Sequence, residues 1–504
     1  MANTNSDKAT NVFFLSREEL RKELKTKTVQ GTLNKVFANG VSAFLTIGST
    51  IILARLLAPK EFGLFAMAVI IADFARLFSE MGLGTATVQR ENINEDEVSM
   101  LFWINVGIGG GSMLVVACFS PVLAWFYGES VLSHLCMSLS VIFIFRGLAV
   151  QHRSLIERQM RFGHLGTIQV LSNVIGVCCA VVLAYRGIGV WALVWREIVT
   201  SIVYAIGSWF FCRWLPRLPR RNVAVWSSLK FGTQVSGFSI IQYFTSSLDR
   251  ILLGRFFGAI PLGLYTRAFQ LAVMPIDYLQ MTVMGVGLSP LSALQNDSER
   301  YKRYFCRLLL VLTFVSMPIV MLVIVKSRNI VGLLLGKEWL DAVPIFRLLA
   351  IAAFVKPILG SFQLVMVSSG KTKRYLQWGT INGVCMIIAF AVGTPYGVSG
   401  ITLAYTSVTY IILGWSLYYC FKGTPISYMI IIRTLLLPVI SSLGAGFVLI
   451  LLLPLVSNKD IFIDIIISCI IIVFAYLSIW VMLPGGRRKL SELWSYRMLI
   501  IKKR

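Results

Sequence analysis

Charged side chains lie within or near the ends of long apolar runs in this 504-residue chain. A charge at the centre of a membrane-spanning helix costs about 2.5–3.5 kcal/mol on insertion scales, so such residues tend to face a bundle interior or a water-filled cavity. The bases in such positions are candidates for binding an anion: Lys356, Arg146, Arg250, Arg267, Arg196 and Arg76. The acids are candidates for coupling to an ion: Asp73, Glu197 and Asp277.

Lys356 is the most informative of these residues because it lies in the middle of its run, beside Pro357, with no acid within four positions. It predicts a cationic lumen for an anionic ligand. Some of the other charges have structural alternatives. Asp73 and Arg76 are three positions apart and can form an ion pair along one helix face. Arg146 lies near the end of its run, as does Arg267, and such a side chain can extend to the interface.

The composition shows what must position these charges. Hydrophobic residues make up 57% of the chain, charged residues 14%, and the mean hydropathy is +0.76. Soluble domains are about 25% charged. The apolar runs are about 20 residues long, which is the length that crosses a bilayer as a helix. We therefore predict an all-α polytopic membrane protein with about fourteen transmembrane helices. The predicted spans are 34–57, 62–85, 98–122, 131–150, 165–185, 188–211, 230–253, 262–285, 302–326, 343–366, 375–395, 397–420, 428–453 and 460–483.

The distribution of Lys and Arg predicts the orientation. Most of the 47 basic residues fall in the N-terminal tail, the C-terminus and alternate loops. Because basic residues favour the cytoplasmic side, both termini are expected there. The net charge of +24 is then explained by topology and contact with anionic lipid, and nucleic acid is not expected as a partner.

The chain also repeats itself at an offset of about 200 residues, which later drifts to about 210. The segment 51–57 aligns with 251–257, and Arg146 aligns with Lys356. Six spans recur in the same order, which predicts two six-helix bundles forming a parallel repeat, with matched cations facing a shared cleft. The predicted organisation is a cytoplasmic tail (1–33), a first bundle (34–211), a basic linker (212–229), a second bundle (230–420), two extra transmembrane helices (421–483) and a basic tail (484–504).

Motifs that suggest other chemistry are incomplete. Gly370-Lys371-Thr372 resembles the end of a phosphate-binding loop, but position 365 is Val and no strand precedes it. The nine cysteines show no metal-ligand spacing. No nucleophile–base arrangement is visible, so we expect neither an enzyme, nor a cofactor, nor a metal site. A GxxxG pattern at 107–111 permits close helix packing.

Several segments resemble a known family. They are Leu53-Ala54-Arg55-Leu56-Leu57-Ala58-Pro59, Phe78-Ser79-Glu80-Met81-Gly82, Phe102-Trp103-Ile104-Asn105 and Glu157-Arg158-Gln159-Met160-Arg161-Phe162. Together they resemble the Wzx-type oligosaccharide flippases, in the branch that includes colanic acid and teichuronic acid exporters. The resemblance is dense over roughly residues 33–210 and thinner to about 420.

The resemblance implies the V-shaped fold of the multidrug/oligosaccharidyl-lipid/polysaccharide (MOP) exporters, with alternating access. It implies that a polyprenyl-pyrophosphate-linked sugar unit moves across the bacterial inner membrane for the synthesis of a surface polysaccharide. Luminal Arg and Lys residues would hold the pyrophosphate. The expected partners are this lipid-linked oligosaccharide and the polymerase and chain-length machinery of the same pathway, and the protein is expected to be a monomer.

Three rival interpretations stay open at this point. A drug or cation antiporter of the same fold would use acids such as Asp73, Glu197 and Asp277, but in-span bases outnumber in-span acids. A polysaccharide polymerase or ligase would be expected to carry a large external loop, which the sequence lacks. A structural membrane scaffold would leave Lys356 unexplained.

Overall fold

The computed structural model describes residues 40–42, 44–79, 83–90, 93–219, 243, 246–456 and 460–492. These residues are predominantly helical and contain no strand, which confirms the predicted all-α class. The chain forms two compact units, Met1–Gly263 and Leu264–Arg504. The bundle and linker boundaries expected from the sequence stay a prediction.

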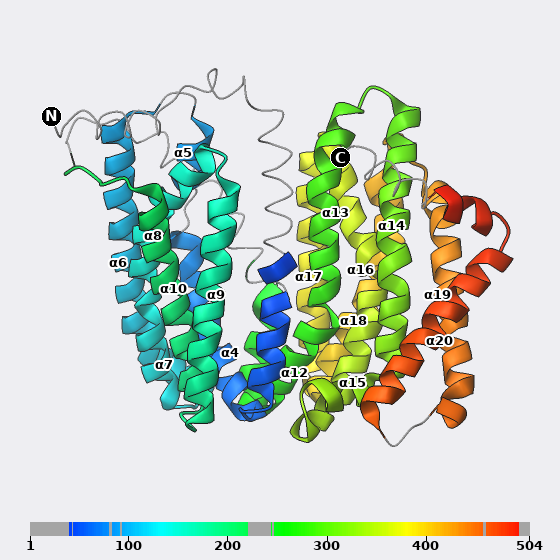
Figure 1. Ribbon diagram of the computed structural model, residues 1–504, viewed down its shortest axis with the longest axis horizontal. Coiled ribbons are helices and arrows are strands. Elements are labelled where there is room, and N and C mark those ends of the chain that lie inside the picture. The colour runs from blue at the N-terminus through cyan, green and yellow to red at the C-terminus, as the bar shows by residue number, and fades with distance from the viewer. Residues whose placement is uncertain are drawn as a thin grey trace. The chain divides into compact units, whose positions relative to one another are not determined.

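The first unit contains one set of helices, shown in blue to green in Figure 1: α4 (Pro59–Ser79), α5 (Leu83–Gln89), α6 (Glu95–Tyr127), α7 (Val131–Ser140), α8 (Ile142–Arg158), α9 (Phe162–Tyr185) and α10 (Trp191–Cys212). Helix α12 (Ala259–Ala272) continues into the second unit. The second unit then contains α13 (Met274–Ala293), α14 (Ser298–Val325), α15 (Ser327–Leu334), η2 (Lys337–Ala342), α16 (Val343–Ser368), α17 (Thr372–Gly393), η3 (Thr394–Tyr396), α18 (Gly397–Phe421), α19 (Tyr428–Val456) and α20 (Ile461–Met482).

Eight helical segments of the described residues are long and apolar enough to cross a membrane. The pair α12 and α13, bent by 42°, makes a ninth if it is one span. The segment Thr372–Phe421 counts once among the eight, although η3 divides it into α17 and α18. Helix α10 is not among them, since Arg196 and Glu197 lower its hydropathy. The helical membrane architecture is confirmed, and the total of fourteen spans stays a prediction.

Local sequence explains where the helices begin, end and bend. Helix α6 is longer than its predicted span of 98–122, because Glu95, Asp96 and Glu97 form its first turn. Acidic side chains are favourable there because the N-terminus of a helix carries partial positive charge. The helix ends at Gly128, whose φ of 72° suits a residue without a side chain. The bend between α12 and α13 lies next to Pro275, which cannot donate a backbone hydrogen bond.

Glycines bring α6 and α8 close together in the first unit. A Cβ added at Gly109 would lie 2.5 Å from the Phe143 carbonyl oxygen, and one at Gly147 would lie 2.7 Å from that of Asn105. Close packing of this predicted span is therefore confirmed. The contact is made by Gly109, however, because Cβ atoms at Gly107 and Gly111 would meet nothing within 4 Å.

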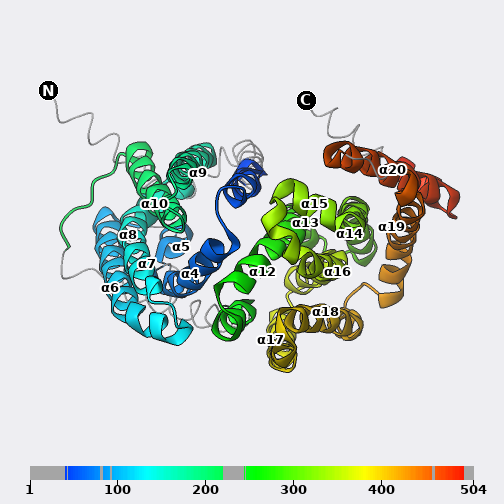
Figure 2. The same cartoon turned by 90° about the horizontal axis from the view of Figure 1, so that it is seen from below.

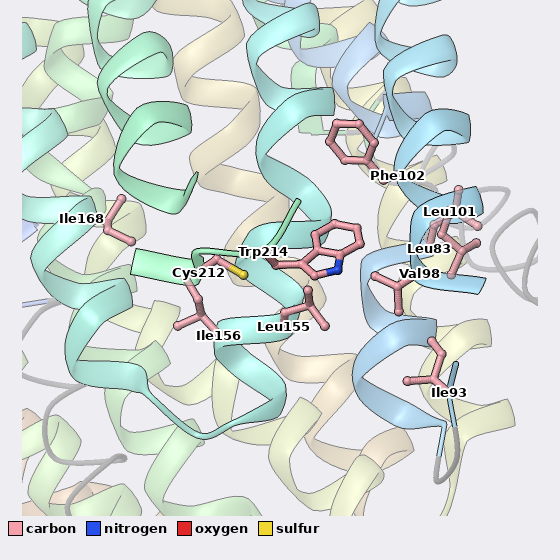
Figure 3. Close-up of a cluster of buried hydrophobic side chains, with 10 residues drawn as sticks. All are labelled: Leu83, Ile93, Val98, Leu101, Phe102, Leu155, Ile156, Ile168, Cys212 and Trp214. Atoms are coloured by element: carbon pink, nitrogen blue, oxygen red, sulfur yellow. The ribbon is translucent and has the colours of Figure 1, made fainter. Parts of the chain in front are cut away.

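Residues 213–219 follow α10 in the chain, and they pack against α6 and α8. The Trp214 side chain is 1% exposed and packs with Phe102, Val98 and Leu155 (Figure 3). Its carbonyl oxygen lies 3.1 Å from His152 Nε2. Farther along, Arg217 forms an ion pair with Glu95 at 2.7 Å. The described start of the predicted linker is thus held firmly against the first unit.

In the second unit, α19 and α20 lie beside α14 (Figure 2). A buried polar cluster joins the end of α14 and the start of α15 to α20. Lys326 Nζ, directly after α14, donates to both Asp464 carboxylate oxygens of α20, at 2.7 and 2.9 Å. Asn329 of α15 donates to the same carboxylate at 2.6 Å. The charged side chains are 4% and 1% exposed, so this ion pair is sealed from solvent.

Candidate functional site

A cavity of about 300 Å³ lies in the first unit, between side chains of α4, α8, α9 and α10. Its charged lining comes from Arg76, Arg146, Arg153 and Glu197. Uncharged polar side chains complete the wall: Gln169, Thr200, Ser201 and Tyr204. A partly open cavity with three cations and one acid, surrounded by apolar helices, is an arrangement suited to holding an anion.

Helical periodicity explains how these side chains converge. On α8, Arg146, Val150 and Arg153 are spaced four and three residues apart, so they lie along one helix face. On α10, Glu197 and Ser201 are four residues apart, as are Thr200 and Tyr204, so these side chains also lie along one helix face. Each helix therefore presents a polar stripe to the cavity within an otherwise apolar sequence.

A smaller cavity of about 110 Å³ shares Arg146 and Glu197 with the larger one and adds Asp73 of α4. Asp73 also forms an ion pair with Arg76 at 3.5 Å, as the spacing of three residues predicts. Both side chains remain partly exposed, at 28% for Asp73 and 42% for Arg76. This contact is therefore not a sealed structural pair, and both groups stay accessible from the cavities. Glu80, which could also pair with Arg76, lies outside the described residues.

Arg153 is a site residue that the sequence analysis missed. The predicted span ended at position 150, which assigned Arg153 to a loop, whereas α8 continues to Arg158. Arg153 also lines a neighbouring cavity of about 220 Å³, with Thr85, Ser154 and Glu157. The available signal was the spacing of seven residues from Arg146, which is two helical turns. Arg153 thus extends the cationic lining along α8.

The second unit contains an ion pair between α13 and α16. Lys356 Nζ of α16 donates to the two Asp277 carboxylate oxygens of α13, at 2.9 and 3.0 Å. The side chains are 22% and 37% exposed, so the pair is half-buried. The Lys356 Nζ also lies 5.6 Å from the centre of the Phe269 ring. No acid lies within four positions of Lys356 in the sequence, and its partner in the structure lies 79 positions away on another helix.

Gly360 contributes to the close approach of α13 and α16. A Cβ at this position would lie 1.9 Å from the Gln280 side-chain amide. Gly360 is one turn from Lys356, and Gln280 is three positions from Asp277, so both lie on the helix faces that carry the ion pair. The absence of a side chain at position 360 leaves room for Gln280 beside the ion pair.

The two units place charges in a similar pattern. In the first unit, an acid of α4 and a base of α8, Asp73 and Arg146, line one cavity. In the second, an acid of α13 and a base of α16, Asp277 and Lys356, are in contact. The offsets along the sequence are about 204 and 210 residues, near those of the predicted repeat. The expectation that both cations face a shared cleft stays a prediction.

The remaining candidates make local contacts. Arg250 donates to the Ser247 hydroxyl at 2.9 Å and lies 4.0 Å from Asp249. Arg267 donates to the Gln270 side-chain oxygen. Arg196 is partly buried on α10, but it does not line the cavities described above. The structure therefore gathers Asp73, Arg76, Arg146 and Glu197 at one place and does not bring Arg196 to it.

Comparisons with known proteins identify relatives across most of the chain. The lipopolysaccharide biosynthesis protein WzxC of Escherichia coli (strain K12) is 25% identical over 86% of this chain and 85% of its own length. The teichuronic acid biosynthesis protein TuaB of Bacillus subtilis (strain 168) is 24% identical over 69% of this chain and 74% of its own. The succinoglycan biosynthesis transport protein ExoT of Rhizobium meliloti (strain 1021) is 25% identical over 69% of this chain and 70% of its own.

Solved structures share the fold. The lipid II flippase MurJ, in an inward closed conformation, superimposes with a TM-score of 0.72 at 16% identity, covering 94% of this chain and 100% of that one. An inward-facing multidrug resistance transporter of the MATE family in the MOP superfamily gives a TM-score of 0.52 at 11% identity, covering 78% and 98%.

The family described as "Polysaccharide biosynthesis protein" matches residues 52–344, which is more than half of the chain. This range includes the cavity in the first unit and all of α13 to η2. The resemblance to Wzx-type exporters is therefore confirmed. This chain is a helical membrane protein that belongs to the polysaccharide biosynthesis protein family.

Proposed function

We propose that this chain is a flippase that moves a polyprenyl-pyrophosphate-linked oligosaccharide across the cytoplasmic membrane during synthesis of a surface polysaccharide. The observation that carries the proposal is the cavity of about 300 Å³ lined by Arg76, Arg146 and Arg153. The relatives named for polysaccharide biosynthesis and transport support the substrate class.

The physical requirement for such a cavity is strict. A pyrophosphate carries several negative charges, and its transfer into hydrocarbon without counter-charges is prohibitive. Arginine stays charged and offers planar donors that match phosphate oxygens. In this mechanism the guanidinium groups replace the water that the head group loses, while the polyprenyl tail remains in the bilayer. The mixed wall of Gln169, Tyr204 and neighbouring hydroxyls suits the sugars.

The proposal includes the arrangement predicted from the sequence. Fourteen spans are divided into six, six and two, with both termini in the cytoplasm, and the two bundles expose the site alternately to each leaflet. The protein acts as a monomer without catalysis of its own and delivers its substrate to the polymerase and chain-length machinery. The similar charge pattern of the two units supports a repeat of this kind.

Complementation tests the role of the cavity. A strain lacking this chain is supplied with wild type, Arg146→Gln or Arg153→Gln, and surface polysaccharide is measured together with the amount of protein in the membrane. A hydrogen bond to a charged group contributes about 1.5–3 kcal/mol, so each variant is expected to reduce export about tenfold or more.

Lys302→Gln is the matched control, because its ammonium is already paired with Glu299 at 2.8 Å outside the cavity. The control should export normally. Full export by both cavity variants at normal protein levels would refute the proposal.

A cation antiporter is the second candidate function, favoured by the acids Asp73 and Glu197 in the smaller cavity and by the fold shared with a multidrug transporter. An antiporter predicts that Glu197→Gln changes drug sensitivity and leaves surface polysaccharide unchanged. If the chain is a flippase, a strain lacking it should lose surface polysaccharide while its drug sensitivity stays unchanged. The two functions are therefore separated by measuring both properties in one strain.

A further inference from the structure

Three cations gather at one end of the second unit, where α16 ends, α17 begins and α18 ends. Lys371 Nζ donates to the Gly423 carbonyl oxygen and lies 3.4 Å from that of Lys422. Arg374, in the first turn of α17, donates to the Lys422 carbonyl oxygen. These contacts satisfy carbonyls at the C-terminus of α18, which have no partner within the helix. They also bring the side chains of two cations to the backbone of a third.

This cluster has an unbalanced positive charge. Among the described residues, no carboxylate forms an ion pair with Lys371, Arg374 or Lys422. Partial burial and the adjacent Arg374 lower the pKa of Lys371 below its usual value. The C-terminus of a helix supplies only about half an elementary negative charge, which does not neutralise three cations.

One other cation at the same end of the unit has an acidic partner. Lys302 pairs with Glu299 at 2.8 Å, at the start of α14. This start lies beside the end of α16, because the Tyr301 hydroxyl is 2.6 Å from that of Ser368. Lys371, Arg374 and Lys422 have no such carboxylate among the described residues, so an external anion would supply their counter-charge.

Aromatic side chains next to the cluster are of the kind that lies at a membrane surface. The Trp415 and Tyr419 rings are stacked with centres 4.7 Å apart, and the Arg374 guanidinium lies 5.6 Å from the Tyr419 ring centre. Lys422 Nζ lies 6.0 Å from the ring centre of Tyr418, which is 62% exposed. Exposed Trp and Tyr beside basic residues are typical of the interface between lipid and water.

The surface that continues from the cluster is apolar. Side chains spaced three or four residues apart along α17 are 41–63% exposed and form one stripe: Ile381, Val384, Ile388 and Val392. Helix α17 lies against α18, and the Trp378 indole donates to the Ser416 hydroxyl at 2.7 Å (Figure 1). A phosphate near Arg374 would thus be continuous with a surface that accepts hydrocarbon.

We infer that Lys371, Arg374 and Lys422 bind the phosphate head group of an anionic glycerophospholipid, whose acyl chains lie along the exposed face of α17. The cations supply the charge and the free N–H donors, the aromatic rings define the depth of the head group, and the apolar stripe holds the chains. This site is separate from the cavity of the first unit and does not depend on which substrate the protein moves.

Native mass spectrometry tests this inference with the full-length protein in detergent. The protein is incubated with equal amounts of phosphatidylglycerol and phosphatidylcholine that have identical acyl chains. Wild type is expected to retain phosphatidylglycerol in preference. Lys371→Gln/Arg374→Gln/Lys422→Gln is expected to lose this preference, by about fivefold for each cation removed. If the triple variant does not fold, Lys422→Gln alone provides the comparison.

Two controls locate the effect. Lys302→Gln removes a paired charge from the same end of the unit, and Arg146→Gln alters the cavity of the first unit, so both should retain the lipid as wild type does. This arrangement separates failure of the lipid site from failure of the proposed transport function. Equal retention of the two lipids by wild type would overturn the inference, as would undiminished retention by the cluster variants. Complete displacement of the lipid by millimolar inorganic phosphate would assign the site to a free anion and would also overturn it.

Discussion

The ion pair between Lys326 and Asp464 should hold α20 to the rest of the second unit. Replacing Asp464 by Leu leaves the Lys326 ammonium in a site where the side chain is 4% exposed. Removing one member of a buried ion pair typically costs about 3–5 kcal/mol, because the remaining charge has lost its partner and has no water. Asn329, which donates to Asp464, offers the ammonium only a neutral amide oxygen and no compensating charge.

The double variant Lys326→Met/Asp464→Leu provides the matched comparison. It removes both charges and replaces them with apolar side chains of similar volume, which is often neutral or stabilising. We therefore expect the double variant to be markedly more stable than Asp464→Leu, even though it carries one more substitution. With wild type and Lys326→Met, these two variants form a double-mutant cycle that measures the interaction between the two side chains.

The assay is reversible unfolding of the purified protein in mixed micelles of dodecylmaltoside and increasing sodium dodecyl sulfate, followed by tryptophan fluorescence. Trp480 of α20 is fully buried, so its fluorescence is expected to change when α20 separates from the unit. The free energy of unfolding should fall by about 3–5 kcal/mol in Asp464→Leu and recover to within about 1 kcal/mol of wild type in the double variant. If Asp464→Leu is as stable as wild type, the ion pair does not hold α20 in place. A double variant no more stable than Asp464→Leu would also contradict this role of the pair.

The remaining predictions concern export and the linker. Arg153→Gln should impair export as severely as Arg146→Gln while the membrane level stays normal, measured as polysaccharide per unit of protein, and export unaffected by Arg153→Gln would remove that residue from the site. Lys356→Ala should also impair export. The exchange Lys356→Asp/Asp277→Lys keeps the ion pair, so the exchanged protein should be about as stable as wild type. If the exchange restores export as well, the pair is structural and the cationic position is not required. Trp214→Ala should lower stability by about 3–5 kcal/mol, since its side chain is 1% exposed, and an unchanged unfolding curve would contradict the described packing.

The helices follow from the sequence because each needs only a local signal. An apolar run of about 20 residues must be helical in a bilayer, and this places α9, α16 and α20 close to their predicted spans. The ends are less predictable, because polar residues continue a helix beyond the apolar run. Helix α6 starts three residues before its predicted span, and α8 continues eight residues beyond its own. The second extension is the reason Arg153 was missed.

Contacts between distant residues could not be derived from local patterns. Lys356 was expected to face a cavity, and its partner Asp277 was known only as a separate in-span acid. Asp464 lies within a predicted span but is 138 positions from Lys326, so nothing in the sequence indicated the pair. Gly109 shows the same limit at a smaller scale. The GxxxG spacing indicated Gly107 and Gly111, whereas the close contact with α8 is made by Gly109.

The leaflet distribution of the lipid-linked oligosaccharide tests the central proposal most directly. Intact and inverted membrane vesicles from a strain lacking this chain are labelled with an impermeant reagent that modifies the sugars. If the chain is a flippase, complete units accumulate on the cytoplasmic leaflet of the deletion strain. Wild type restores the pool on the outer leaflet, and Arg146→Gln does not. Normal appearance of the units on the outer leaflet in the deletion strain would contradict this function.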